Sequence, residues 1–107
     1  MATTATYRQA GDVLDYLNET TDVIGDGTIL TIGKRIGVAG CTIAPGAIGS
    51  AHVTGVFRLP KGSDAIKQGD ELFWDGEKVA ASGDVAAGYA FETAGADAET
   101  VAVKINA

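Results

Sequence analysis

The side chains best suited to chemistry in this sequence are its single cysteine, Cys41, and its single histidine, His52. A thiol beside an imidazole can lose its proton and act as a nucleophile. Neither residue belongs to a longer reactive motif, and each has a simpler interpretation. We expect Cys41 to be a small apolar residue near a turn and His52 to lie on the outer face of a strand. The sequence therefore predicts no catalytic residue and no enzyme.

The Gly33-Lys34 pair is the fragment closest to a phosphate-binding loop. Such a loop needs a second glycine at a fixed distance upstream and a serine or threonine after the lysine. Thr28 and Arg35 occupy those two positions. The lysine also lies between two strand-like segments, so no helix begins there to offer its N-terminus to a phosphate. We predict no nucleotide site and no cofactor.

The residue types in the sequence give little support for a metal-binding site. Structural zinc needs four ligands, and one cysteine with one histidine supplies two. Asp22 and Asp26, beside the Gly25–Gly27 turn, are the best carboxylates for calcium. Their spacing is not that of the helical calcium loop. We predict solvated turn carboxylates and no metal site.

The carboxylate pairs Asp70-Glu71 and Asp75/Glu77 fall at strand ends and at a turn. General acid–base catalysis needs a pocket that moves the pKa values of such groups apart. The sequence indicates no such pocket, so we expect these charges to be solvated.

The apolar residues that must build the fold are mostly β-branched. The sequence has nine valines and eight isoleucines against five leucines, with eleven threonines and fifteen glycines. Branched side chains pack well on pleated strands, and glycines permit tight turns. This composition predicts an all-β fold, a small antiparallel β-sandwich or barrel of about eight or nine short strands.

The chain divides into a flexible N-terminal arm, residues 1–8, and a single β domain, residues 9–107. The Asp75-Gly76 pair predicts a hairpin, and Ala44-Pro45-Gly46 predicts a type II turn. Residues 60–69 are polar and could hold one helical turn. The expected strands are Asp12–Asn18, Thr20–Ile24, Thr28–Ile32, Ile36–Ala39, Ser50–Leu59, Glu71–Trp74, Glu77–Val79, Val85–Glu92 and Thr100–Ile105.

The charge balance disfavours nucleic acid as a partner. The net charge is −6, and the eight basic residues are scattered apart from Lys34-Arg35. The apolar runs are much shorter than the roughly 20 residues of a membrane span. The N-terminus lacks the basic start and apolar segment of a signal peptide. We expect synthesis in a cytoplasm and no membrane partner.

Ordered pieces along nearly the whole chain resemble the family of phage capsid cement, or head decoration, proteins, which are small products of head gene clusters. The most specific piece is Gly55-Val56-Phe57-Arg58-Leu59-Pro60-Lys61. The other matching pieces are Gly11–Tyr16, Gly33 with Ile36–Ala39, Gly46–Gly49, Gly69 with Leu72–Asp75, Gly88–Ala90 and Thr100–Ile105.

The resemblance implies an all-β protein without catalytic residues that binds the outer surface of a tailed-phage or prophage head. It implies a homotrimer, with the major capsid protein as partner and the virion as location after synthesis in the bacterial host cytoplasm. We expect the arm to contact the capsid, because Thr3, Thr4, Thr6, Tyr7 and Arg8 could add a strand to an exposed sheet edge. Trp74, beside the Asp75-Gly76 turn, is either a core residue or an interface anchor.

Other functions stay open at this point. Members of the same family have also been described as RecA/RadA-family phage recombinases, so one alternative is an accessory recombination or nucleic-acid-associated protein. Such an ATPase core needs a phosphate-binding loop and a longer chain, and this sequence has neither. The remaining alternatives are another structural head or tail component, or a small enzyme that uses Cys41 and His52.

Overall fold

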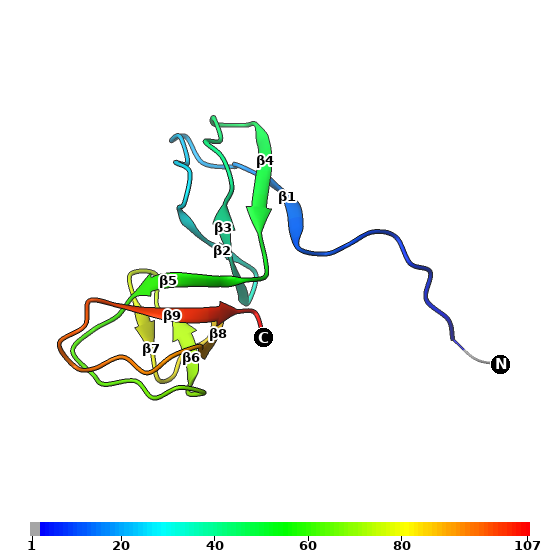
Figure 1. The fold of residues 1–107 in the computed structure, drawn as a ribbon. Helices are drawn as coiled ribbons and strands as arrows, with labels where there is room; N and C mark the ends of the chain where they lie inside the picture. Colours follow the sequence, from blue (N-terminus) through cyan, green and yellow to red (C-terminus); the bar gives the residue numbers. More distant parts are fainter. Residues whose placement is uncertain (1–2) are drawn as a thin grey trace.

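The computed structural model describes residues 3–107 as nine β-strands in two antiparallel sheets, without a helix in that range (Figure 1). The all-β prediction is confirmed, and the arrangement is sandwich-like with open sheet edges. The strands are β1 (Val13–Leu17), β2 (Ile29–Ile32), β3 (Arg35–Ala39), β4 (Ile48–His52), β5 (Val56–Pro60), β6 (Glu71–Trp74), β7 (Val79–Ala80), β8 (Ala86–Ala90) and β9 (Thr100–Ile105).

The two sheets have the same strand topology. The first has the order β1-β4-β3-β2, and the second has the order β5-β9-β8-β6 with β7 added at the edge. Strands β1, β2, β3 and β4 therefore correspond to β5, β6, β8 and β9. We call residues 13–52 the first unit and residues 56–105 the second unit. The chain therefore folds as two units with the same strand topology, although the sequence carries no exact repeat.

A tight turn recurs before β2, β4, β6 and β9. Each turn closes with a hydrogen bond from a backbone N–H to the carbonyl three residues earlier: Thr28 to Gly25, Ala47 to Ala44, Asp70 to Lys67, and Ala98 to Gly95. The apolar residues just before the turns pair as isolated bridges, Ile24 with Ile43 and Ile66 with Ala94. The turn predicted at residues 44–46 is confirmed, since Gly46 has a φ of 76°.

One hydrophobic cluster joins the two units. Ile36 and Val38 of β3 are buried in the same cluster as Leu59, Val103 and Ile105 of the second unit. A smaller cluster in the first unit contains only Leu30, Ala39 and Ala51 as fully buried members. Most of the buried apolar surface therefore lies in the second unit and at its contact with β3.

The segment Ser50–Leu59, expected as one long strand, is two strands in different sheets. Strand β4 ends at His52 and β5 begins at Val56. Gly55 has a φ of 115°, a value that side-chain-bearing residues rarely adopt, and the chain turns there into the second unit. The expectation of a continuous strand was wrong. Apolar and polar residues alternate without interruption through this corner, so the pattern gave no sign that the chain changes sheets.

The expected strand Thr20–Ile24 is instead a loop organised by Asn18. The Asn18 side chain is fully buried, and its Nδ2 donates to the carbonyls of Asp22 (2.8 Å) and Ile43 (3.0 Å). Its Oδ1 accepts from the backbone N–H (3.0 Å) and the hydroxyl (2.6 Å) of Thr20. Local side-chain hydrogen bonds of this kind compete successfully with strand pairing in polar segments.

The substitution Asn18→Asp is expected to destabilise the protein by about 3 kcal/mol or more, because a buried carboxylate oxygen would face two carbonyl oxygens. Urea unfolding followed by Trp74 fluorescence measures the change. Thr20→Val is the matched control, since it removes one exposed partner and should cost about 1 kcal/mol. Equal stability of Asn18→Asp and the wild type would contradict the structural role of Asn18.

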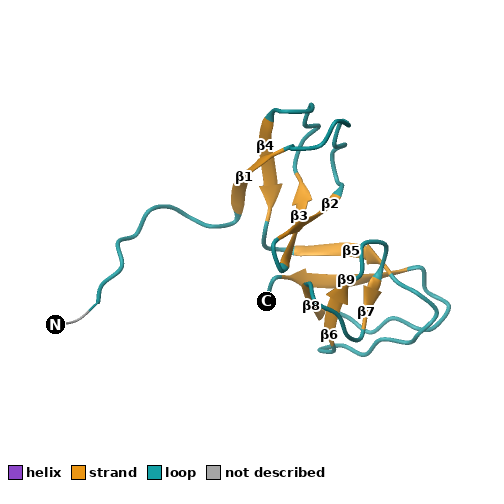
Figure 2. Cartoon of the chain, turned by 180° about the vertical axis from the view of Figure 1, so that it is seen from behind, coloured by secondary structure: helices purple, strands orange, loops and turns teal. Residues whose placement is uncertain are grey.

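Residues 3–12 form no strand and extend away from both sheets, as both views show (Figures 1 and 2). The side chains of residues 3–8 are exposed. Residues 1 and 2, which the sequence also assigns to the arm, lie outside the described residues. The division into an arm and one β domain stays a prediction.

Candidate functional site

Cys41 and His52, the two residues considered as a nucleophile pair, have separate neighbours. The Cys41 thiol lies 3.9 Å from the Ser50 hydroxyl, whereas the His52 ring lies 5.9 Å from the Phe57 ring, centroid to centroid. Within residues 3–107, no hydrogen bond joins the thiol to the imidazole.

Gly33 and Lys34 form the two-residue turn of the β2–β3 hairpin. Ile32 pairs with Arg35, and Gly33 has a φ of 61°, as the first central position of a type II′ turn requires. The Lys34 carbonyl accepts a hydrogen bond from Ala86 of the second unit. The pair therefore has a clear structural role as a hairpin turn and a contact between units.

The carboxylates do not gather into a metal site within the described part of the chain, where no group of three metal-ligating side chains occurs. Asp75 has a structural partner instead: its Oδ1 accepts from the backbone N–H of Glu77 and of Lys78, both at 2.8 Å. These bonds, first that from Lys78 and then that from Glu77, hold the pKa of Asp75 below its ordinary value. A hairpin forms where it was predicted, but its second strand begins at Val79 and not at Glu77, because Asp75 organises residues 75–78 as a four-residue loop.

The β6–β7 loop is expected to loosen only at a pH below the ordinary aspartate pKa of about 4. A depressed pKa in the folded state means that the Asp75 contribution is present above the unfolded pKa and is lost as the pH falls through the folded pKa. An NMR titration of the Glu77 and Lys78 amides measures this midpoint. Asp75→Asn keeps an accepting oxygen and should abolish the titration; a wild-type midpoint above 4 would contradict the assignment.

Trp74, considered as an interface anchor, lies in the core. Its side chain is 8% exposed and belongs to the hydrophobic cluster that contains Leu72 and Val79. The position at the end of β6, before the hairpin loop, points the ring inward. This placement favours the interpretation of Trp74 as a core residue.

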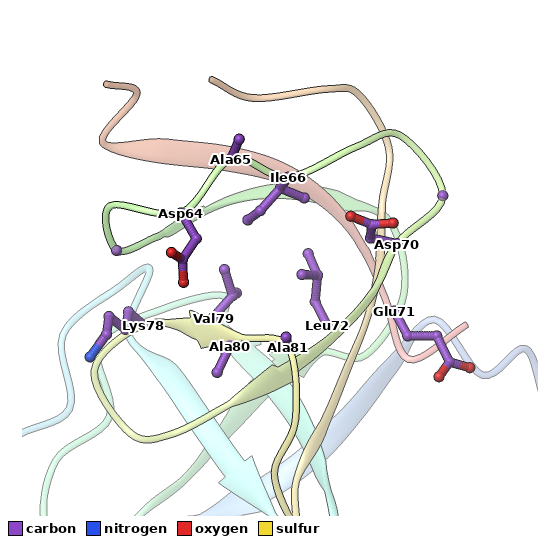
Figure 3. Close-up of a pocket in the computed structure, with 12 residues that line it drawn as sticks. Asp64, Ala65, Ile66, Asp70, Glu71, Leu72, Lys78, Val79, Ala80 and Ala81 are labelled. Carbon is purple, nitrogen blue, oxygen red and sulfur yellow. The ribbon is translucent and has the colours of Figure 1, made fainter. Parts of the chain in front are cut away.

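A pocket lies between the loop of residues 62–70 and the β6–β7 hairpin, and we call it the β6–β7 pocket. Its volume is about 620 Å³. Ile66, Leu72 and Val79 point toward one another at its floor (Figure 3). This size lies in the range of small-molecule and peptide side-chain sites.

The rim of the β6–β7 pocket carries more negative than positive charge. Asp64, Asp70 and Glu71 line it together with one cation, Lys78. The Lys78 ammonium lies 3.3 Å from the Asp75 carboxylate, which neutralises part of its positive charge. Asp64, in contrast, forms no ion pair within residues 3–107, and its carboxylate points into the space between loop and hairpin (Figure 3).

The exposed apolar side chains are the remaining candidates for contact with other proteins. Tyr7 on the arm is 83% exposed, and Ile48 on β4 is 67% exposed. Ile48 lies directly opposite Leu17 of β1, so these two form an apolar pair on the outer face of the first unit. No helix of the described residues has the length and apolar character of a membrane-crossing segment.

Comparison with known proteins decides the family. Residues 8–105 match the family described as phage cement protein, a match over nearly the whole chain. The chain belongs to the phage cement protein family. This membership indicates a structural, capsid-associated role in the virion. No curated protein and no solved structure gave a significant match.

One residue in the segments that resemble the cement proteins has a clear structural role. Lys61, in the segment most specific to the cement proteins, is 8% exposed, and its ammonium donates to the carbonyls of Gly62 (2.8 Å) and Ala98 (3.1 Å). It ties the loop after β5 to the turn before β9. Sequence reasoning missed this role and missed the β6–β7 pocket, whose walls are brought together by pairing between distant segments, as in the bridge Lys61–Val79.

Proposed function

We propose that this cement protein decorates the outer surface of a tailed-phage or prophage head and stabilises the shell against the pressure of the packaged genome. The family match over residues 8–105 is the observation that carries the proposal. The structure adds a body of two sheets joined by one buried cluster, and an exposed arm. Neither feature needs a bound small molecule to act.

The proposed mechanism is the bridging of shell subunits. A body with a shared core keeps its shape under load, because packed protein interiors are hardly compressible. When it contacts several shell subunits at once, individually weak contacts add up through effective concentration. A homotrimer matches the local threefold points of a shell and repeats each contact three times.

The arm is the proposed contact with the major capsid protein. Thr3, Thr4 and Thr6 are exposed residues of high β-propensity, followed by Tyr7 and Arg8. An extended segment with free backbone groups can pair with an exposed sheet edge of the shell. The acidic body then stays outside, where its charge keeps the particle soluble.

The test uses heads that lack this protein, to which the purified chain is added back. Cryo-electron microscopy should show added density on the outer surface at sites of local threefold symmetry. The temperature at which the heads release DNA should rise with occupancy. Density confined to the tail or the connector, or an unchanged release temperature at full occupancy, would overturn the proposal in favour of another virion component.

Binding of nucleic acid is expected to be negligible, which separates this function from an accessory recombination role. An electrophoretic shift assay with single-stranded DNA at low salt gives such binding its best chance, since the electrostatic attraction is strongest there. With a net charge of −6, we expect no shift at micromolar protein. A salt-sensitive shift in that range would favour the recombination alternative.

A further inference from the structure

The β6–β7 pocket has the chemistry of a receptor for one aromatic and one cationic side chain. Its floor of Ile66, Leu72 and Val79 offers apolar surface that a ring can cover. The Asp64 carboxylate points into the same space and forms no ion pair within the described residues. A ligand that combines a ring with a positive charge would satisfy both parts of this pocket.

The arm carries that combination in adjacent residues. Tyr7 is 83% exposed, and Arg8 is exposed beside it. The described part of the arm contains no acidic residue before Asp12, so its charge is opposite to that of the pocket rim. Because residues 3–11 form no strand hydrogen bonds, successive side chains need not point to opposite sides of the backbone.

The arm does not occupy the pocket of its own chain in this structure. It leaves the first unit on the side away from the loop of residues 62–70, as Figure 1 shows. A second copy carries the same arm and can supply it. Insertion into a second copy is a head-to-tail contact, and contacts of this type close into rings when their rotation permits.

We propose that the β6–β7 pocket binds Tyr7 and Arg8 from the arm of a second copy of this chain. The Tyr7 ring covers Ile66, Leu72 and Val79, and the Arg8 guanidinium pairs with Asp64. Thr3, Thr4 and Thr6, which precede these two residues, stay free to meet the shell. This contact would form the interface between subunits of the proposed trimer, and in that respect it rests on the proposed function. Self-association of the chain can nevertheless be measured without phage heads.

The first experiment measures self-association of the full chain by sedimentation velocity over a range of concentrations. Tyr7→Ala and Ala65→Trp, the second of which adds a bulky side chain at an exposed residue of the pocket lining, should each weaken association by about tenfold or more, as loss of a central aromatic contact typically does. Ala96→Trp, at an exposed turn outside the pocket, is the matched control and should associate like the wild type.

The second experiment reverses the proposed ion pair. Arg8→Glu alone and Asp64→Lys alone should weaken association, whereas the double variant should recover most of it. Both side chains are exposed and make no hydrogen bond within the described residues, so both single variants should keep the wild-type circular dichroism spectrum and Tm.

The outcomes separate this proposal from the proposed function. A wild-type chain that stays monomeric at hundreds of micromolar, or an oligomer that Tyr7→Ala and Ala65→Trp leave intact, would overturn the pocket proposal while leaving capsid decoration in place. Loss of head binding by Arg8→Glu without any change in self-association would assign the arm to the shell alone. Recovery in the double charge reversal supports the pocket as the site.

Discussion

The substitution Gly88→Ala is expected to destabilise the protein strongly. Gly88 lies in β8 beside a bulge, where the pairing with β6 shifts between Leu72 and Phe73. Its φ is 137°, and a Cβ at this position would overlap the Lys104 carbonyl oxygen and lie 2.9 Å from the carbonyl carbon. These are backbone atoms of β9 in the middle of the second unit, and they cannot move aside alone.

We expect the Gly88→Ala change to cost at least about 4 kcal/mol, a large part of the roughly 5–15 kcal/mol that stabilises a typical domain. Circular dichroism and Trp74 fluorescence during urea unfolding measure the loss. Gly76→Ala is the matched control: Gly76 also has a positive φ, 102°, but no atom lies within 4 Å of the added Cβ. That variant should lose only about 1 kcal/mol. Similar stabilities for the two variants would show that the close approach of β9 is not what requires glycine.

Deletion of residues 2–8 is expected to abolish binding to heads while the body keeps its fold. The described residues of this segment are exposed and make no hydrogen bond to either sheet. Their removal should therefore change Tm by no more than 1–2 °C, about the effect of a surface change. Co-sedimentation of labelled protein with heads measures the binding, which should fall below detection at concentrations that saturate the wild type.

A chain in which residues 3–8 are replaced by glycine and serine keeps the length of the arm and removes its side chains. If the backbone alone pairs with the shell, this variant should retain part of the binding. If Tyr7 and Arg8 provide the contact, it should bind no better than the deletion. Full binding by the deletion variant itself would show that the shell contact lies on the body, where the Leu17–Ile48 pair is one exposed apolar surface.

The sequence predicted the strands best where a glycine or a polar pair ends them. Glu71–Trp74, which Asp75-Gly76 follows, and Thr100–Ile105 have the predicted bounds, whereas the second strand of the hairpin begins at Val79 and not at Glu77. The prediction was wrong at Val53–Gly55, because alternation of apolar and polar residues does not reveal that a strand leaves one sheet and enters another. The hydrogen bonds that mark this corner, Val53 to Asp12 and Ile105 to Gly55, come from distant segments.

The two-unit plan could have been found from spacing, although no exact repeat exists. An isoleucine is followed by a glycine three residues later at Ile24, Ile43 and Ile66, and these are the turns that the structure shows to be equivalent. The β6–β7 pocket left no such signal. Ile66, Leu72 and Val79 have the pattern of ordinary core residues, and the sequence does not show that the chain beside the loop of residues 62–70 pairs with β7, as it does in the bridge Lys61–Val79.

The pairing of β1 with β4 determines how the molecule responds to mechanical tension on the arm. Val13, where the arm joins β1, lies opposite His52, where β4 leaves for the second unit. A pull between arm and body would therefore peel β1 away from that end, breaking its hydrogen bonds one after another instead of loading them together. If the arm is the attachment to the shell, it yields at low force, and a particle under pressure would have to distribute its load over many copies.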